Sequence, residues 1–573
     1  MNMRVWFQPH STGTHAAVLR LFNNSTNAPE ADISLRGTGE PQNLALGTPF
    51  CTHTVVDHPV SNSGRLVKAV RTINDITEDG KNDIIVSTEN YWTMALNGNG
   101  SGTTDSLWAF TSYISNYSAG SIGTTGDYSH QKALEIASDL NGDGFNDVVI
   151  GTGGGNEHVY AIDGKKGTLI WTYGTDAQDS FSLGDFTAVD VKRDFTNDGV
   201  PDVVAIASAT ETGGIGGRRM AYLFNGTNGE ILWTAPMEGF THGIISVGDL
   251  NNAGTPDVIA TVGEPSYKAT AFNGTNGVQL WNYPVPSGGS AKEVMEFPVA
   301  GSTPDIILGA FWGPIYRLDG TTGTQMWSRP TGNSGVMQLG RLKDVTGDSV
   351  DEVLAALLGN GTYCINGANG NIVWSLATAN TMGVTAVSDL NGDGIDEVAI
   401  AVQNTGAKIV HGNNGEQLAL YATSNSEQAR EIAIVPDMDA NNSFEIIFGG
   451  KIGNVALLSG GPDAPVGIPS SAQSLPKEFS LSNNYPNPFN PSTTFRLNLP
   501  QMANVEISIY NILGQKIRGI SYDNLAAGTN EIQWNGKNDN GETATSGVYI
   551  ARVRAFNSTK ELYSSHLKMI LMK

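Results

Sequence analysis

Cysteine and basic residues are scarce in this 573-residue chain. The two cysteines, Cys51 and Cys364, lie far apart in the sequence and define no disulfide framework. Lys and Arg total 33 against 56 Asp and Glu, which gives a formal net charge of −23. Because nucleic-acid phosphates are bound by clustered Lys and Arg, this balance argues against a nucleic-acid partner and favours cations.

Long apolar runs are missing too. No stretch approaches the roughly 18 apolar residues of a membrane span, and the start MNMRVWFQPH lacks the apolar core of a signal peptide. We therefore expect no transmembrane segment, and an export signal that is either upstream or removed. Charged residues make up only 16% of the chain, and 69 glycines fall between short β-branched runs. This composition indicates a globular, all-β protein with many tight turns.

A repeat fills most of the chain. Each unit has an apolar strand, an acidic loop, a second strand, a glycine turn and a strand ending in an aromatic residue, as in ALEIASDLNGDGFNDVVIGTGGGNEHVYAIDGKKGTLIWTY. The aromatic residues are separated by 62, 48, 46, 47 and 47 residues: Trp171, Trp233, Trp281, Trp327, Trp374 and Tyr421. This period predicts the four-stranded blades of a β-propeller.

The acidic loops predict eight blades. They begin at Asp75, Asp139, Asp194, Asp249, Asp344, Asp389 and Asp437, with a degenerate copy near residue 297 that retains Asp305. The last unit has three strands, and residues 48–56 form an orphan strand before the first unit. Pairing the two would close the ring and leave no exposed edge. Seven blades are compatible with the sequence if one weak unit is an insertion.

The loop DLNGDGFND has a composition suited to a metal. Asp139, Asn141, Asp143 and Asp147 place oxygen atoms at positions 1, 3, 5 and 9. With a backbone carbonyl at position 7 they would supply the six to eight oxygens that Ca²⁺ takes, and Gly144 at position 6 permits the sharp turn. The sequence VVI follows at once, so the loop runs into a strand and is not an EF-hand.

Five further loops repeat this spacing: Asp75, Thr77, Asp79 and Asp83; Asp194, Thr196, Asp198 and Asp202; Asp344, Thr346, Asp348 and Glu352; Asp389, Asn391, Asp393 and Glu397; and Asp437, Asp439, Asn441 and Glu445. The Asp249 copy has Ala253 at position 5 and is expected to bind weakly or not at all. Ser349 replaces the glycine of the Asp344 copy, which strains the turn. Metal-free Asx turns are the alternative, but six copies that crowd carboxylates together predict about six Ca²⁺ sites with a mainly structural role.

These loops resemble the FG-GAP repeats of integrin α-chain propellers and their bacterial VCBS-type relatives, over about residues 65–460. The resemblance implies a calcium-loaded ring. The blade ends with the pattern G-x-x-x-W are also similar to the tryptophan-docking repeats of quinoprotein propellers. Quinoprotein dehydrogenases carry a vicinal disulfide, which Cys51 and Cys364 do not provide because they are not adjacent.

Catalytic motifs are absent from the sequence: it contains no HExxH, no GxSxG and no phosphate loop. His130, His158 and His242 flank blade strands and could line one face, although satisfied histidines are the simpler interpretation. We predict a non-catalytic adhesion or binding module, with no catalytic residues, whose ligand is a glycan or a protein at one propeller face. The alternative is a calcium-dependent polysaccharide lyase or another propeller enzyme.

The regions flanking the propeller (48–460) have other patterns. Residues 461–477, GPDAPVGIPSSAQSLPK, are predicted to be a linker. Residues 478–573 alternate as in a small Ig-like β-sandwich. Their markers YPNPFNP (485–491), Gly514, Gln515, SGVY (546–549) and a basic end resemble the C-terminal sorting domain of type IX secretion, a FlgD-type Ig-like domain. This implies an outer-membrane secretion partner and a secreted or surface-attached location; a generic Ig-like module is the alternative.

The N-terminal residues 1–40 resemble the last strands of a Hydin-type Ig-like domain, through the stretch VWFQPHSTGTHAAVLRLFNNSTNAPEADISLRGTGEP. Only the end of such a domain is present. The sequence therefore predicts that the chain is the C-terminal piece of a longer surface protein.

Overall fold

The computed structural model shows an all-β protein with two compact units, Met1–Ile468 and Pro469–Lys573. It describes residues 13–22, 30–39, 44–59, 64–98, 102–103, 106–113, 121–122, 131–153, 156–175, 184–208, 218–286, 288–299, 301–332, 334–378, 380–424, 427–438, 443–461, 479–481, 484, 487, 489, 493–500, 503–525, 528–539, 543–556 and 560–572. The predicted linker lies outside these residues apart from Gly461. No helix in the described parts of the chain has the length and apolar character to cross a membrane.

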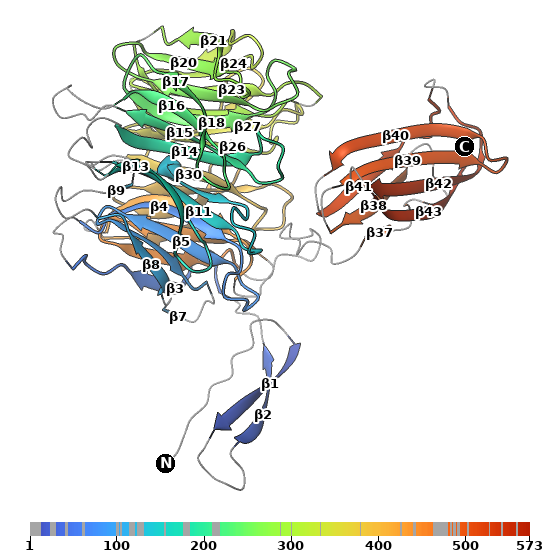
Figure 1. Ribbon diagram of the computed structural model, residues 1–573, viewed down its shortest axis with the longest axis horizontal. Coiled ribbons are helices and arrows are strands. Elements are labelled where there is room, and N and C mark those ends of the chain that lie inside the picture. The colour runs from blue at the N-terminus through green and yellow to red at the C-terminus, as the bar shows by residue number, and fades with distance from the viewer. Residues whose placement is uncertain are drawn as a thin grey trace. The chain divides into compact units, whose positions relative to one another are not determined.

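Eight four-stranded blades form the propeller of the first unit within its described residues (Figure 1). The first four are β4 (Val67–Ile73), β5 (Asp83–Thr88), β6 (Trp92–Leu96) and β8 (Ser106–Thr111); β10 (Leu134–Ala137), β11 (Asp147–Gly153), β12 (Glu157–Ile162) and β13 (Leu169–Thr175); β14 (Asp185–Arg193), β15 (Asp202–Ser208), β16 (Met220–Phe224) and β17 (Ile231–Pro236); β18 (Thr241–Val247), β19 (Asp257–Val262), β20 (Lys268–Phe272) and β21 (Gln279–Pro284). Three short elements accompany them: β7 (Gly102–Thr103), β9 (Ser121–Ile122) and the 3-10 helix η1 (Gln131–Ala133) before β10.

The other four blades are β22 (Ser290–Phe297), β23 (Asp305–Phe311), β24 (Ile315–Leu318) and β25 (Gln325–Arg329); β26 (Gly335–Leu342), β27 (Glu352–Leu358), β28 (Gly361–Asn366) and β29 (Ile372–Leu376); β30 (Thr381–Val387), β31 (Glu397–Val402), β32 (Gly406–Val410) and β33 (Gln417–Ala422); β34 (Ala429–Val435), β35 (Glu445–Gly450), β36 (Asn454–Leu458) and β3 (Pro49–Thr54). The predicted count of eight is confirmed, and the weak copy near residue 297 is a complete blade.

The ring is closed by the orphan strand. β3 pairs antiparallel with β36, from Thr54 opposite Asn454 to Pro49 opposite Leu458, as the sequence predicts. The first strand of each blade contacts the first strand of the next around the whole ring, β34 and β4 included. Cys51 and Val55 are fully buried in the apolar cluster between the last and first blades. Both cysteines are buried, and neither forms a disulfide.

Successive blades are fastened by one repeated contact. The indole N–H of Trp233, in β17, donates to the carbonyl of Gly274 in the next blade, 2.7 Å away. Five more tryptophans do the same with Gly164, Gly226, Gly320, Gly367 and Gly412: Trp108, Trp171, Trp281, Trp327 and Trp374. The sequence analysis did not include Trp108, which precedes Trp171 by 63 residues.

Replacement of Trp233 by Phe is expected to destabilise the propeller by about 2 kcal/mol, since the buried Gly274 carbonyl then lacks its donor. Trp312→Phe is the matched control, because Trp312 is 56% exposed and should change stability by less than about 0.5 kcal/mol. Urea unfolding midpoints measure both. Equal midpoints for the two variants would contradict the docking role of Trp233.

The second unit is a two-sheet sandwich (Figure 1). One sheet has β37 (Ser480–Leu481), β38 (Thr493–Leu499) and β41 (Gly528–Trp534); the other has β40 (Lys516–Leu525), β39 (Ala503–Asn511), β42 (Gly547–Phe556) and β43 (Glu561–Leu571). Alternating residues of β38, β39 and β42 are buried, and they form one apolar cluster with Trp534 and Phe489. Near the other end of the chain, β1 (Gly13–Phe22) and β2 (Glu30–Gly39) form an antiparallel hairpin.

Candidate functional site

The acidic loops join the first and second strands of their blades, and the carboxylate at position 1 shapes each turn. Asp139 accepts the backbone N–H groups of Gly142 and Gly144 at 2.6 and 2.7 Å. Asp249 closes its loop in the same way, although Ala253 occupies position 5. An aspartate at position 5 is therefore not needed to form the turn.

Position 6 adopts a left-handed backbone. Gly144 has a φ of 91° and Ser349 a φ of 67°. A side chain is strained in this region, so the structure places Ser349 where the sequence predicts strain. Its N–H nevertheless donates to Asp344 at 2.7 Å, which keeps the turn closed.

An aspartate at position 9 ties its loop to the glycine turn of the blade. Asp147 is fully buried and accepts the N–H groups of Leu140 and Gly164 at 2.7 and 2.9 Å. Burial, with nearby carboxylates, raises the pKa of Asp147 to about 6 and those of Glu352 and Glu397 to about 7. A cation in these loops would offset this desolvation and like-charge repulsion.

Glu352 provides the test of whether a loop fits a cation. Its side chain is fully buried, and its Oε2 accepts the N–H of Val345 at 3.1 Å. Its Oε1 is buried without a hydrogen-bond partner. A buried carboxylate oxygen without a donor is costly, and Asp344 and Asp348 add repulsion. The all-oxygen donor set of this loop fits Ca²⁺.

In the loop that begins at Asp389, the structure adds His411, which the sequence analysis did not identify. Within the described residues, Asp393, Glu397 and His411 bring their ligand atoms within 4.8 Å of one another. His411 Nε2 lies 2.5 Å from Asp393 Oδ2. His411 opens the glycine turn of its blade, and in the preceding blade the equivalent Asn366 contacts position 5 as well. An alignment of the glycine turns is the signal that could have pointed to this position.

The other predicted loops have varied surroundings. Those after β4 and β14 repeat the contacts described above through Asp75, Thr77, Asp79 and Asp83 and through Asp194, Thr196, Asp198 and Asp202. In the loop after β10, Lys166 contacts Asp143 at 3.0 Å. In the last loop, Glu445 accepts the N–H of Met438 at 2.5 Å, and Asp439 and Asn441 lie outside the described residues.

The fifth blade has replaced its loop with an ion pair. Asp305, at the former position 9, receives Arg317 Nε at 2.7 Å, and both side chains are buried. Arg317 also donates to the carbonyl of Gly367 in the next blade at 2.7 Å. A guanidinium group therefore neutralises the position-9 acid where the sequence has lost the other loop residues.

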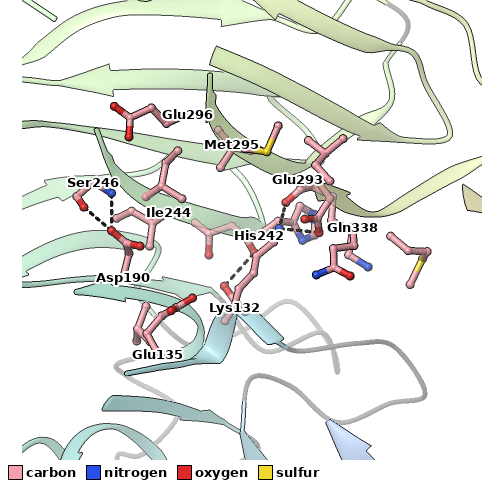
Figure 2. A pocket seen from close by; sticks show the side chains of 18 of the residues that line it. Lys132, Glu135, Asp190, His242, Ile244, Ser246, Glu293, Met295, Glu296 and Gln338 are labelled. Carbon is pink, nitrogen blue, oxygen red and sulfur yellow. Dashed lines mark hydrogen bonds and ion pairs between the residues drawn. The ribbon is translucent and has the colours of Figure 1, made fainter. Parts of the chain in front are cut away.

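A pocket of about 670 Å³ lies along the propeller axis, between the first strands of the first six blades (Figure 2). Its lining combines apolar side chains such as Ile244, Phe311 and Met337 with several charged side chains. Most of these charged side chains form salt bridges: Arg71 with Glu135 at 3.2 Å, Lys132 with Glu293 at 2.7 Å, and Lys192 with Asp190 at 2.8 Å. Asp190 also accepts the N–H and the hydroxyl of Ser246.

His242 is the histidine that the fold brings into this pocket. Burial, together with the ammonium groups of Lys292 and Lys132, lowers its pKa to about 3, so the imidazole is neutral. His158 is buried in β12 and stacks on Tyr160, with ring centroids 5.1 Å apart, as a packed strand residue. His130 lies outside the described residues.

Two family models match parts of the chain. The model described as outer membrane protein assembly factor BamB matches residues 155–393, and the FlgD Ig-like domain model matches residues 486–559. The chain thus contains a BamB-like β-propeller and a C-terminal FlgD Ig-like domain. The more specific resemblances, to FG-GAP repeats and to a type IX sorting domain, stay predictions. No curated protein matches the chain.

Solved structures share the propeller fold at low identity. Sqt1 of Saccharomyces cerevisiae is 9% identical, covers 73% of this chain and 100% of its own, and has a TM-score of 0.50. BamB from Moraxella catarrhalis is 12% identical over 72% and 99%, with a TM-score of 0.42. The quinohemoprotein alcohol dehydrogenase ADHIIG of Pseudomonas putida HK5 is 12% identical over 76% and 79%, with a TM-score of 0.49. At these identities the likeness to Sqt1 concerns the fold alone.

Proposed function

We propose that this protein is a secreted or surface-attached, calcium-stabilised adhesion or binding module without catalytic activity, and that its ligand is a glycan or a protein. The axial pocket is the observation that carries the proposal. It is large enough for a small ligand, and it combines apolar side chains with polar groups from several blades. Its ion pairs fix those side chains in place, which suits recognition more than proton transfer.

Calcium is proposed to stiffen this scaffold at about six loops of the FG-GAP type. The buried, unpartnered Oε1 of Glu352 and the raised pKa of the position-9 acids support a cation. Asp344, Thr346, Asp348 and Glu352 would hold one ion. When bound, Ca²⁺ would supply positive charge between the strands of a blade, and it would have no part in a reaction.

The C-terminal domain is proposed to engage the type IX secretion machinery. Two of its marker residues have structural roles: Asn487 accepts the N–H of Ile570, and the N–H of Phe489 donates to the Ile570 carbonyl, both at 2.9 Å. A different part offers a docking surface. Ile512 and Leu513, in the β39–β40 hairpin, are 75% and 77% exposed, and a large exposed apolar pair suits contact with a partner.

The binding proposal is tested by screening the full chain, with calcium present, against immobilised glycans and extracellular proteins, and by assaying the same glycans for chain cleavage. We expect a saturable ligand and no cleavage. Cleavage of a bound polymer would contradict the non-catalytic assignment, and a protein that folds but retains nothing would contradict the binding function.

A polysaccharide lyase is the second candidate, because neutral His242 lies near Lys132 and Glu293 inside the axial pocket (Figure 2). A neutral imidazole can accept the α-proton of a uronic acid, but a pKa of about 3 makes His242 a weak base, which favours the binding function. The cleavage assay decides between the two functions. Release of unsaturated products that is lost in His242→Gln would establish the lyase.

A further inference from the structure

Trp312, in the hairpin between β23 and β24, has an unusual backbone conformation for a bulky residue. Its φ is 63°, and its side chain is 56% exposed. This left-handed region is costly for a residue with a large side chain and suits glycine. In the next blade, Gly359 follows Leu358 as Trp312 follows Phe311, and it has a φ of 102°. The two positions are equivalent, because each preceding residue pairs with the first residue of its blade.

Packing in the core does not account for a tryptophan at this position. Two other aromatic residues in such hairpins, Tyr91 and Tyr267, also have a left-handed backbone. Tyr91 is buried, and Tyr267 packs against the apolar cluster between the fourth and fifth blades. More than half of the Trp312 side chain is instead in solvent. Strained residues cluster at ligand clamps and other functional sites, and strain without burial therefore points to a ligand.

Trp312 lies at the edge of the axial pocket. Its neighbour Phe311 lines the pocket, and the two rings pack in a T-shaped arrangement with their centroids 5.0 Å apart. Lys292, also in the lining, has its Nζ 5.0 Å from the centroid of the Phe311 ring. Phe311 thus contacts a side chain inside the pocket and positions the Trp312 indole just outside it.

Polar groups lie inside the pocket beside this aromatic pair. Ser290 is opposite Phe311 in the β22–β23 ladder, and it lines the pocket together with His242 (Figure 2). Ser290 Oγ and His242 Nε2 both lie beside Gly263. Hydroxyl and imidazole groups can donate and accept hydrogen bonds. The site therefore combines an apolar face at its edge with hydrogen-bonding groups inside.

This combination matches a sugar ring better than a protein. A pyranose whose hydroxyl groups are all equatorial presents C–H bonds on its faces, which pack on an aromatic ring, and hydroxyl groups at its rim, which form hydrogen bonds. The pocket volume of about 670 Å³ suits a short oligosaccharide. A protein ligand buries roughly 800 Å² of each partner, which is a broad surface and not the edge of a pocket.

We propose that Trp312 is the aromatic platform for a β-linked glucose or xylose unit, and that the next unit of the same oligosaccharide enters the axial pocket and bonds to Ser290 and His242. Glucose and xylose are specified because their pyranose rings carry no axial hydroxyl group. This inference rests on the proposed binding function and narrows its ligand to a neutral glycan. No bond is made or broken.

The test is calorimetric titration of the full chain with three β-linked tetrasaccharides: cellotetraose, xylotetraose and mannotetraose. We expect cellotetraose or xylotetraose to bind about 10-fold more tightly than mannotetraose, whose units carry an axial hydroxyl group. Trp312→Gly should weaken the better ligand about 10- to 100-fold. Trp312→Phe retains an aromatic face and should lose less. The melting temperature of Trp312→Gly should change by less than about 2 °C, because glycine suits this backbone.

Ile452→Gly is the matched control. Ile452 is an exposed apolar residue in the hairpin between β35 and β36, and the described lining of the pocket includes no residue of that blade. Its variant should bind the tetrasaccharide as the wild-type protein does. Quenching of tryptophan fluorescence by acrylamide gives a second readout. The bound tetrasaccharide should protect fluorescence in the wild-type protein and in Ile452→Gly, but not in Trp312→Gly.

The inference is overturned if none of the three tetrasaccharides binds, if mannotetraose binds as tightly as the other two, or if Trp312→Gly binds as the wild-type protein does. The first two results need no variant, so they decide the matter even if Trp312→Gly fails to fold.

Failure of this inference can be told from failure of the binding function. If the ligand screen finds a protein, or a glycan whose affinity is the same in Trp312→Gly, the assignment to Trp312 is wrong and the binding function stands. If nothing binds in either experiment, both are wrong.

Discussion

Chelation is expected to lower the melting temperature of the propeller by more than about 10 °C, and elemental analysis of the untreated protein should find about six calcium ions. Extracellular calcium modules bind at roughly 10⁻⁴ to 10⁻³ M, so each site contributes on the order of 1 to 2 kcal/mol at millimolar calcium. Six such contributions are comparable with the whole stability of an ordinary domain. The experiment uses the full chain, with the sandwich domain as an internal reference that should not respond.

The Asp249 loop shows which substitution removes a calcium ligand without changing the turn. Asp198→Ala gives its loop the position-5 residue of the Asp249 loop, whose turn keeps its shape with Ala253. The variant should therefore fold and lose one ion. Ala253→Ser, in the loop expected to bind weakly or not at all, should change neither ion count nor melting temperature. If the protein contains no metal and its melting temperature does not respond to chelator, the loops are Asx turns that bind no calcium.

The blade architecture was predictable because its signals are local. An acidic loop, a glycine turn and an aromatic residue recur within each unit, and each of them makes a defined contact. Asp147 accepts the N–H of Gly164, and the carbonyl of the same glycine accepts the indole N–H of Trp108. Even the degenerate fifth unit kept Asp305, because the position-9 contact to the glycine turn is part of the blade. This contact explains why counting loops gave eight.

The axial pocket was not predictable from the same signals. Its residues come from strands that are roughly one blade apart in the sequence, and each looks like an ordinary strand residue. Lys292 lines the pocket at the point where the register between β22 and β23 shifts, between Ala291 and Glu293. Such a shift depends on pairing with the next strand, and the strand's own residues do not reveal it.

The candidate calcium loops were predictable only in part. The spacing identified the loop residues, but not their neighbours across the blade, so His411 and Lys166 were missed. Hydrogen bonds also hold the acids at positions 1 and 9 of the Asp249 loop, in which Ala253 replaces the position-5 aspartate. Positions 3 and 5 therefore discriminate a metal site from a turn better than the conspicuous first aspartate.

Removal of β3, the strand that closes the ring, is the second change that we expect to destabilise the propeller strongly. A chain that starts at Gly64 lacks β3 and Val55, whereas a chain that starts at Leu44 keeps both, and neither has the β1–β2 hairpin. Without β3, the backbone groups of β36 are exposed at an edge, and the cluster between the last and first blades loses Cys51 and Val55. The loss is on the order of 5 kcal/mol from these two side chains and the ladder.

The shorter chain is expected to melt more than about 10 °C below the longer one and to associate through the open edge of β36. Light scattering and thermal unfolding measure the two effects. A synthetic peptide of residues 44–59 should restore the melting temperature and suppress association, because it can pair with β36 as β3 does. If the two chains have the same melting temperature, closure by β3 does not stabilise the ring. If the peptide binds without restoring stability, the blade clusters hold the ring together and the closing strand only covers its edge.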